Sequence, residues 1–172
     1  MLELPLARCT IRSWRAEDAA SVVSNANNRN VWRNLLDGFP HPYTLADAEN
    51  WIRLASGGKP ETHFAIEVNG MAVGGIGFHM LDDVYRRTAR IGYWLGEAYW
   101  NRGIATEALA ALTTYALSRF DFARIEATVF EWNTASGRVL EKAGYTLEAR
   151  LRKRTTKDGR TVDEFMYARV RD

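Results

Sequence analysis

The chain has 172 residues, 47% of them apolar and 26% charged, which is typical of one globular domain over residues 1–172 rather than a disordered chain. Its net charge of +2 is too small to indicate nucleic-acid binding, and its single cysteine, Cys9, excludes an internal disulfide and a cysteine-rich metal site. The N-terminus predicts no signal peptide and the weakly polar run 108–117 is too short to cross a bilayer, so we expect a cytoplasmic protein.

The first half of the chain predicts a strand, two helices and an antiparallel meander. Thr44 and Asp47 form a capping pair before an apolar helical pattern, and Asn69-Gly70 is typical of a two-residue hairpin turn. The predicted elements are a strand at 10–14, a helix at 16–26, an irregular segment with one helical turn at 27–42, a helix ending at 57–58, and strands at 64–68, 72–80 and 89–95.

The second half predicts a helix, a strand, a shorter helix and a hairpin. The predicted elements are a helix at 104–119, a strand at 125–129, a helix at 133–142 closed by Gly144, and strands at 145–153 and 161–169 joined across 157–159. We therefore expect an α/β (mixed α+β) fold, with a mostly antiparallel twisted sheet of six to seven strands and helices on both faces. Its middle strand–helix–strand unit should be a parallel, right-handed crossover.

The segment 93–106 is the first candidate for chemistry. A strand ends, a tight turn follows, and a helix begins with the small residues Gly103 and Ala105. Free N–H groups at a helix start, together with the helix dipole, bind anions, and Gly103 lets the main chain approach a phosphate closely. Arg102 adds a charged side chain. Taken alone, the pattern favours an ordinary strand-to-helix turn, because short glycine motifs match many unrelated loops.

A second motif lies downstream: Asn-Thr-Ala-Ser at 133–136, followed by Val-Leu-Glu-Lys-Ala-Gly-Tyr at 139–145. With both motifs, the chain from Cys9 onward resembles the GCN5-related N-acetyltransferase (GNAT) superfamily, and most closely its RimJ/RimL-like branch. The superfamily's phosphate loop is Gln/Arg-x-x-Gly-x-Gly/Ala. Gly103 and Ala105 match its last two fixed positions, whereas Trp100 stands where Gln or Arg is usual. The resemblance implies the GNAT fold and transfer of acetyl from acetyl-CoA to a primary amine.

The resemblance also implies where acetyl-CoA, the co-substrate, would lie, and it implies no metal. The expected place is the splay between the strand ending at Leu95 and the strand around Val129. The implied cofactor contacts are backbone groups of Tyr93, Trp94 and Leu95 for the pantetheine arm, N–H groups of Arg102, Gly103, Ile104, Ala105 and Thr106 for the pyrophosphate, and Asn133. Asn133 equally fits a helix N-cap, and the two roles are compatible.

Amine attack on a thioester needs a proton acceptor, N–H donors for the oxyanion and an acid for the leaving sulfur. Many relatives carry a tyrosine seven residues after the matching Asn, but this chain has Leu140 there. If a side chain is the acid, Ser136 is the candidate, although a plain helix-terminus serine explains it equally well. Glu131 is the first candidate base, with Glu126, His79 and a chain of waters as alternatives.

The acceptor amine is expected beside the segment 27–43. The resemblance implies Trp32, Phe39 and Tyr43 as acceptor-binding residues, and His79 is a further candidate near the site. Packing onto the core would explain the aromatic residues equally well. The acceptors compatible with this branch are a protein N-terminus, a polyamine or another small amine.

We expect direct attack in a ternary complex, because Cys9 matches no nucleophile of the family. The alternative is a catalytically inactive CoA-binding sensor or partner-binding module, favoured by Leu140 and by Arg90, which stands where relatives often carry Glu. An RNA- or ribosome-binding role has support only from the basic run 150–154. A homodimer is compatible with the resemblance.

Overall fold

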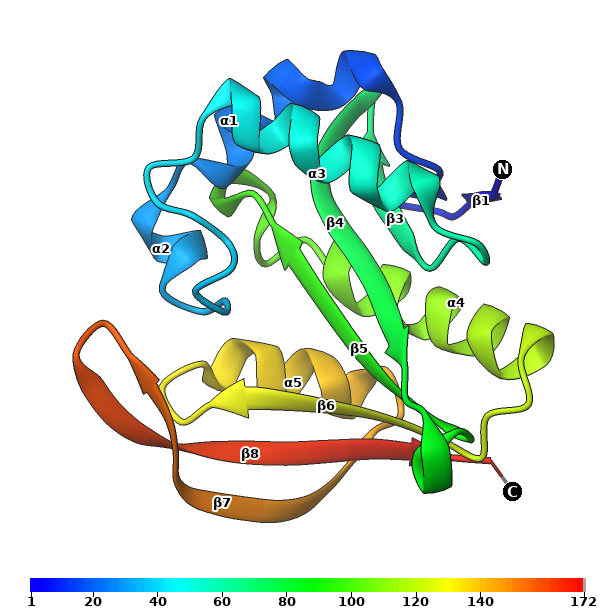
Figure 1. The fold of residues 1–172 in the computed structure, drawn as a ribbon, viewed down its shortest axis with the longest axis vertical. Coiled ribbons are helices and arrows are strands. Elements are labelled where there is room, and N and C mark those ends of the chain that lie inside the picture. Colours follow the sequence, from blue (N-terminus) through cyan, green and yellow to red (C-terminus); the bar gives the residue numbers. More distant parts are fainter. Residues whose placement is uncertain (172) are drawn as a thin grey trace.

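One eight-stranded sheet runs through the computed structural model, which describes residues 1–171 (Figure 1). The strands are β1 (Glu3–Pro5), β2 (Thr10–Arg12), β3 (His63–Val68), β4 (Met71–Met80), β5 (Thr88–Leu95), β6 (Arg124–Phe130), β7 (Thr146–Lys157) and β8 (Arg160–Val170). The α-helices are α1 (Ala19–Ala26), α2 (Arg29–Trp32), α3 (Leu45–Gly57), α4 (Ile104–Arg119) and α5 (Thr134–Lys142). The strand order is β1-β2-β3-β4-β5-β6-β8-β7, and every neighbouring pair is antiparallel except β5 and β6.

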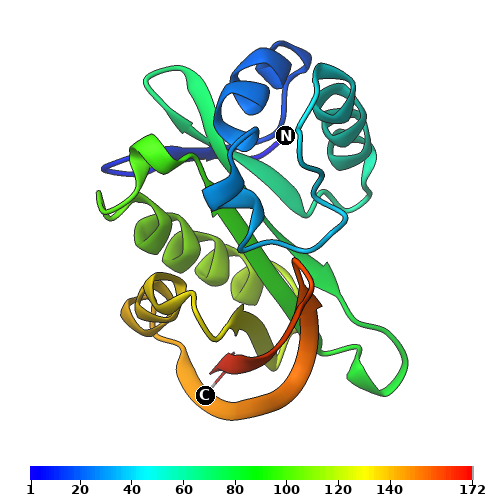
Figure 2. The ribbon, with the colours of Figure 1, turned by 90° about the vertical axis from the view of Figure 1, so that its left-hand side faces the viewer.

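Helices cover both faces of the sheet, as the sequence predicts. On one face α4 buries Leu109 and Leu112 against the central strands, and α5 adds Leu140 to the same core. On the other face α1 and α3 form a second core with Val22 and Ile52. The second core lies over the first four strands, so the opposite end of that face carries no helix (Figures 1 and 2).

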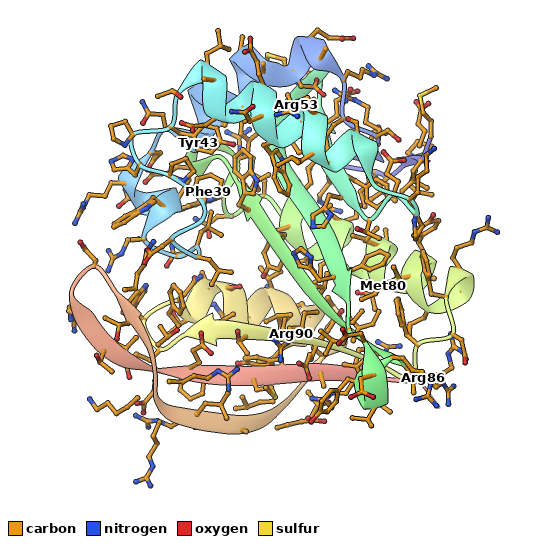
Figure 3. The ribbon with its side chains drawn as sticks, in the orientation of Figure 1. Phe39, Tyr43, Arg53, Met80, Arg86 and Arg90 are labelled. Atoms are coloured by element: carbon orange, nitrogen blue, oxygen red, sulfur yellow. The ribbon has the colours of Figure 1, made fainter. Side chains whose placement is uncertain are left out.

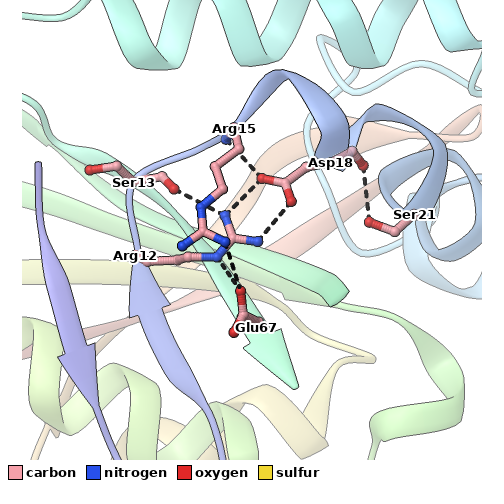
Figure 4. A network of polar contacts seen from close by, with 6 residues as sticks. All are labelled: Arg12, Ser13, Arg15, Asp18, Ser21 and Glu67. Atoms are coloured by element: carbon pink, nitrogen blue, oxygen red, sulfur yellow. Dashed lines mark hydrogen bonds and ion pairs between the residues drawn. The ribbon is translucent and has the colours of Figure 1, made fainter. Parts of the chain in front are cut away.

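A buried arginine fastens the start of α1 to the sheet (Figure 4). Arg12 of β2 donates to both carboxylate oxygens of Asp18, at 2.8 and 2.7 Å, and its Nε donates to Glu67 of β3. Arg12 and Asp18 are almost fully buried, so each removes the cost of burying the other's charge. These bonds fix where the chain leaves the sheet to form the second core.

Local sequence signals account for most element boundaries. Thr44 Oγ1 accepts from Asp47 N at 3.2 Å, and the Asp47 carboxylate accepts from Thr44 N at 2.8 Å, so the predicted capping box is confirmed. Asn69 and Gly70 both have positive φ, as a type I′ hairpin turn requires. The one helical turn predicted within 27–42 is α2, which Asn28 caps.

Three features differ from the predicted elements. The structure adds an eighth strand, β1, which pairs with β2. The helix predicted at 16–26 begins as a 3-10 turn at Ala16–Asp18 before α1. The last hairpin is longer than predicted, and β7 contains a register shift between Leu151 and Thr155, where Lys153 has φ of +52°.

The parallel pair at the centre of the sheet is short. β5 and β6 pair only where Thr88, Ala89 and Arg90 face Arg124, Ile125 and Glu126. Beyond Arg90 the two strands diverge, and Figure 1 shows β5 running away from β6 towards the side where α2 lies. This divergence, called the splay below, confirms the predicted separation of Leu95 from Val129. Within residues 1–171, no helix has both the length and the apolar character needed to span a bilayer.

Candidate active site

The loop after β5 presents a row of free backbone donors. Gly103 is the N-cap of α4 with φ of +76°, a left-handed conformation that suits glycine. Within residues 1–171, the N–H groups of 102–106 donate no hydrogen bond to backbone or side chain. Consecutive unpaired donors at the start of a sixteen-residue helix favour an anion, and the described residues therefore fit a pyrophosphate at this place.

Trp100 has a structural role at the position where the family usually has Gln or Arg. Its indole Nε1 donates to the carbonyl of Leu95 at 2.7 Å, which ties the loop to the end of β5. Arg102 is exposed, and its guanidinium carbon lies 5.5 Å from the ring centroid of Tyr99. Arg102 is therefore free to turn towards an anion bound at the start of α4.

Alternate residues of β5 turn their backbone groups towards the splay. Gly96 N donates to Val73 O of β4, whereas Arg124 N of β6 donates to Arg87 O, so the odd-numbered residues face β6. Tyr93 and Leu95 therefore turn their backbone groups towards the splay, where the Leu95 carbonyl already accepts from Trp100. Their contact with the pantetheine arm stays a prediction. Trp94 pairs with Gly75 of β4 instead, so its backbone groups point away from the splay.

The start of α5 carries the second predicted group. Asn133 is the N-cap, and its side-chain oxygen accepts from Ser136 N at 3.3 Å. The hydroxyl oxygen of Ser136 lies 2.7 Å from the phenol oxygen of Tyr93, which reaches across from β5. Burial raises the pKa of the Tyr93 phenol to about 12, although its hydrogen bond with Ser136 opposes the rise. A pair of neutral hydroxyls thus joins β5 to α5.

The face of the splay opposite α4 and α5 is called the acceptor face below. Strand register places on it, among other positions, Trp94, Gly92, Arg90, Glu126, Phe130 and Glu164. No atom lies within 4 Å of the place where a Cβ on Gly92 would stand, and the strand there is regular. β5 therefore has no bulge at Gly92, and open space lies beside its backbone.

The carboxylates of the acceptor face are paired with arginines. Glu126 accepts from Arg90 Nε at 2.9 Å and from Arg124 Nε at 3.0 Å. Burial acts to raise the pKa of Glu126, but these two bonds outweigh it and the net shift is downward. Glu164 is buried and its carboxylate lies 3.1 Å from Arg154 Nε. Glu126 is thus held ionised, which makes it a poor proton acceptor near neutral pH.

Glu131 stands at the edge of this arrangement. It lines a surface cavity of about 520 Å³ together with Arg150, Arg152, Lys153 and Asp163. Within residues 1–171, its side chain makes no hydrogen bond or ion pair, and the hydrogen bonds of Ser136 that involve a side chain go to Asn133 and Tyr93. Its assignment as the base stays a prediction.

The four predicted acceptor-binding residues lie at three separate places in the structure. Phe39 and Tyr43 lie together, with ring centroids 4.8 Å apart, and Phe39 packs edge-on against Trp94 at 5.5 Å (Figure 3). His79 lies on the acceptor face beside Arg90, and its ring centroid is 4.7 Å from that of His63, with the two rings tilted by 59°. Trp32 lies in neither group.

Trp32 belongs to a set of contacts that we call the loop bridge. The bridge joins the segment 29–37 to the turn between β7 and β8 and to the loop after β6 (Figure 2). Lys157 Nζ lies 3.8 Å from the Trp32 ring centroid and 2.8 Å from Asp37 Oδ1. Trp132 Nε1 donates to Asn34 Oδ1 at 3.0 Å, and Arg29 pairs with Asp158 at 2.6 Å. Segments more than ninety residues apart are thereby held beside the acceptor face.

Cys9 is buried in the core beneath α4. Burial, together with the charge of Glu107, raises the pKa of its thiol to about 11. A buried, protonated thiol is a poor nucleophile, which supports direct attack without an acyl-cysteine intermediate. Within residues 1–171, no three His, Cys, Asp or Glu side chains gather as metal ligands would.

The sequence analysis missed the side chains of Tyr93, Trp132, Lys157 and Glu164. The alternation of β5 already places Tyr93 on the helix-facing side, so its position was accessible from the pattern. Lys157 is different, because a lysine in a polar turn gives no sign of burial until the turn is seen to contact the segment 29–37.

Comparison with known proteins identifies the family. The family described as "Acetyltransferase (GNAT) domain" matches residues 8–146. The N-acetyltransferase p20 of Bacillus licheniformis is 35% identical over 169 residues, covering 94% of this chain and 92% of that protein. The N-acetyltransferase YoaA of Bacillus subtilis (strain 168) is 37% identical over 99 residues, covering 58% of this chain, and the chain spans only 55% of that relative.

Solved structures agree on the fold. A GNAT-family acetyltransferase from Bacillus anthracis superposes with a TM-score of 0.84 at 26% identity, covering 98% of both chains. RimL, described as a ribosomal L7/L12 alpha-N-protein acetyltransferase in complex with coenzyme A, superposes with a TM-score of 0.85 at 21% identity, again over 98% of both chains. The RimL likeness shows the fold alone.

Proposed function

The chain belongs to the GNAT acetyltransferase family and is an acetyl-CoA-dependent N-acetyltransferase, and from that premise we propose that its acceptor is the free N-terminal amine of a polypeptide. The observation that carries the acetyl-transfer site is the splay, which leaves the backbone of Tyr93 and the N–H of Leu95 without a partner strand beside the free donors at the start of α4. Bound acetyl-CoA supplies an activated acyl group there.

The residues of the chain divide the work of that reaction. The N–H groups of 102–106 would hold the pyrophosphate, and the backbone groups of Tyr93 and Leu95 would align the pantetheine arm. A backbone N–H directed at the thioester oxygen stabilises the negative charge that develops on it. Ser136 stands at the start of α5 as the proton donor for the departing sulfur. The single domain expected for residues 1–172 is part of this proposal.

The charge of the acceptor face supports a polypeptide N-terminus over a polyamine. A polyamine carries several positive charges and needs carboxylates that are free to receive them. Glu126 and Glu164 on this face are each engaged by arginine, and Glu148 pairs with Arg124 beside Glu126. In the loop bridge, Asp37 and Asp158 are likewise paired, with Lys157 and Arg29, so the bridge offers no free carboxylate either. An acceptor with one amine followed by neutral or acidic groups suits this field better.

The aromatic residues beside Trp94 supply the apolar part of the proposed acceptor site. Phe39 and Tyr43 are held in contact with each other and lie at the end of the acceptor face that adjoins Trp94. Tyr43 is 4% exposed and belongs to the second core, so an extended peptide passing Gly92 would place its first side chain against the partly buried Phe39 ring. RimL, with its printed description as an alpha-N-protein acetyltransferase, provides a precedent on the same fold.

A thiol-release assay with acetyl-CoA and matched acceptors tests this proposal. The acceptors are an octapeptide with a free N-terminus and acidic residues at positions two to four, its lysine-substituted counterpart, the same peptides with blocked N-termini, and spermidine. We expect turnover with the free N-termini, faster for the acidic peptide, and none with the blocked peptides. Faster turnover of spermidine, or acetylation of lysine side chains in the blocked peptide as located by mass spectrometry, would overturn the acceptor assignment.

A further inference from the structure

The hydroxyl pair between β5 and α5 has a chemical consequence beyond the packing of these elements. The backbone of Tyr93 faces the splay, and its side chain reaches the first turn of α5. Its phenol lies 2.7 Å from Ser136 Oγ and 3.4 Å from the Ser136 carbonyl oxygen, to which it is also oriented to donate. The shorter contact is the stronger one, and it joins the candidate acid to a second hydroxyl.

A lone serine is a weak acid for a departing thiolate. An alcohol gives up its proton far less readily than a phenol does, and a serine that gives up its proton must recover one at once. The Tyr93 phenol stays protonated at neutral pH, since burial holds its pKa at about 12. It is therefore a proton source in contact with the hydroxyl that has to be replenished.

We propose that Tyr93 positions Ser136 and supplies the proton that Ser136 passes to the leaving sulfur, an inference that rests on the acetyl transfer described under "Proposed function". As the amine nitrogen bonds to the carbonyl carbon and the C–S bond breaks, the sulfur keeps the electron pair and takes the Ser136 proton. Ser136 Oγ takes the Tyr93 proton in the same step. The proton lost by the amine nitrogen passes into water, and water returns one to the Tyr93 oxygen, so the overall reaction leaves both hydroxyls unchanged.

The position of Tyr93 bears on Leu140 of α5. Leu140 stands where many relatives have a tyrosine, and here it is fully buried in the core with no polar group to offer. In this chain the phenol reaches the start of α5 from β5 instead, on the opposite arm of the splay. The acid function is thereby shared between β5 and α5, whose hydroxyls are in contact.

Tyr93→Phe, Ser136→Ala and the double variant test the proposal, with Tyr145→Phe as a matched control. Tyr145 is a buried tyrosine whose hydroxyl lies 2.7 Å from Thr113 Oγ1, and burial likewise raises its pKa to about 12. Removing the phenol oxygen therefore breaks the same kind of hydroxyl pair in both single tyrosine variants. Steady-state kinetics are measured with acetyl-CoA and the best acceptor peptide, and acetyl-CoA binding is measured by calorimetry.

We expect Tyr93→Phe to lower kcat by about 10- to 100-fold, with acetyl-CoA affinity within twofold of wild type. Because Tyr93 acts through Ser136, the double variant should be no slower than Ser136→Ala alone. Tyr145→Phe should keep kcat within twofold. The proposal is overturned by an unchanged kcat in Tyr93→Phe, by a loss confined to acetyl-CoA binding, by additive losses in the double variant, or by an equal loss in Tyr145→Phe. A wild-type chain that transfers acetyl to no amine would instead refute the proposed function itself.

Discussion

The central ion pair of the loop bridge joins Lys157 and Asp37, and we expect removal of Asp37 to lower the free energy of unfolding more than removal of Lys157 does. Lys157 is 2% exposed, whereas its partner Asp37 is 77% exposed. Replacing Lys157 by Met removes one charge-assisted hydrogen bond, about 1.5–3 kcal/mol, and one cation–π contact, about 2 kcal/mol. It also removes the cost of burying the ammonium, which is several kcal/mol, and Met fills a similar volume. We therefore expect Lys157→Met to change the free energy of unfolding by less than about 1.5 kcal/mol.

Replacing Asp37 by Ala leaves the ammonium buried against Trp32 without a carboxylate. Breaking a fully buried pair in this way costs about 3–5 kcal/mol, and the exposure of Asp37 lets water recover part of that, so we expect a loss of about 2–3 kcal/mol. The double variant should be about as stable as Lys157→Met alone. Arg87→Ala, which breaks an exposed pair with Asp121, is the control and should cost less than about 1 kcal/mol.

Urea denaturation followed by tryptophan fluorescence measures these free energies, and acceptor kinetics report on function. Because the bridge holds the segment 29–37 beside the acceptor face, Asp37→Ala should raise the KM for the peptide acceptor and leave acetyl-CoA affinity unchanged. A larger loss in Lys157→Met than in Asp37→Ala, or strictly additive losses in the double variant, would refute the reasoning.

Three further predictions concern the buried polar groups. Arg12→Met leaves Asp18 buried without its partner and should lower the free energy of unfolding by about 3–5 kcal/mol in urea titrations, whereas a loss below about 1 kcal/mol would show that the pair contributes little. Burial and the neighbouring His79 lower the pKa of His63 from 6.5 to about 4. Between these two pH values the unfolded chain binds a proton that the folded chain does not, so the free energy of unfolding falls as the pH falls. Denaturation at pH 7, 5.5 and 4 measures the slope of the free energy of unfolding against pH. His63→Gln should lower this slope by somewhat less than about 1.4 kcal/mol per pH unit, because His63 is partly exposed. An unchanged slope would show that His63 does not cause the pH dependence. A thiol reagent should label Cys9 only after denaturation, and rapid labelling of the native chain would contradict its burial.

Most of the fold follows from patterns that depend on near neighbours in sequence. The capping pair at Thr44 and the turn at Asn69-Gly70 fix their elements through contacts within four residues, and both were predicted. β1 was missed because a three-residue strand has too few alternating positions to give a pattern, and it exists by pairing with β2. The bulged β7 was predicted too short for a similar reason, since Asp163 of the opposite strand bonds Lys153 N at the irregularity.

The sequence predicts where the backbone of the site lies better than it predicts which side chains meet there. Gly103 and Asn133 mark the two helix starts by local chemistry, so the loop and the cap could be placed from the sequence. The contact between Tyr93 and Ser136, and the burial of Lys157, depend on how elements 43 and 120 residues apart meet. No local pattern encodes such distances, which is why the hydroxyl pair and the loop bridge came only from the structure.

Calorimetric titration of acetyl-CoA tests the central claim most directly, namely that the splay and the free donors before α4 form the acetyl-CoA site. Gly103→Val forces a branched side chain into a left-handed conformation at the donors, and Gly70→Val imposes the same strain at the turn between β3 and β4. The wild-type chain and Gly70→Val should each bind one acetyl-CoA per chain with similar affinity, and Gly103→Val should bind at least about tenfold more weakly, a difference of about 1.4 kcal/mol. No binding to the wild-type chain, or equal binding to all three, would contradict the account.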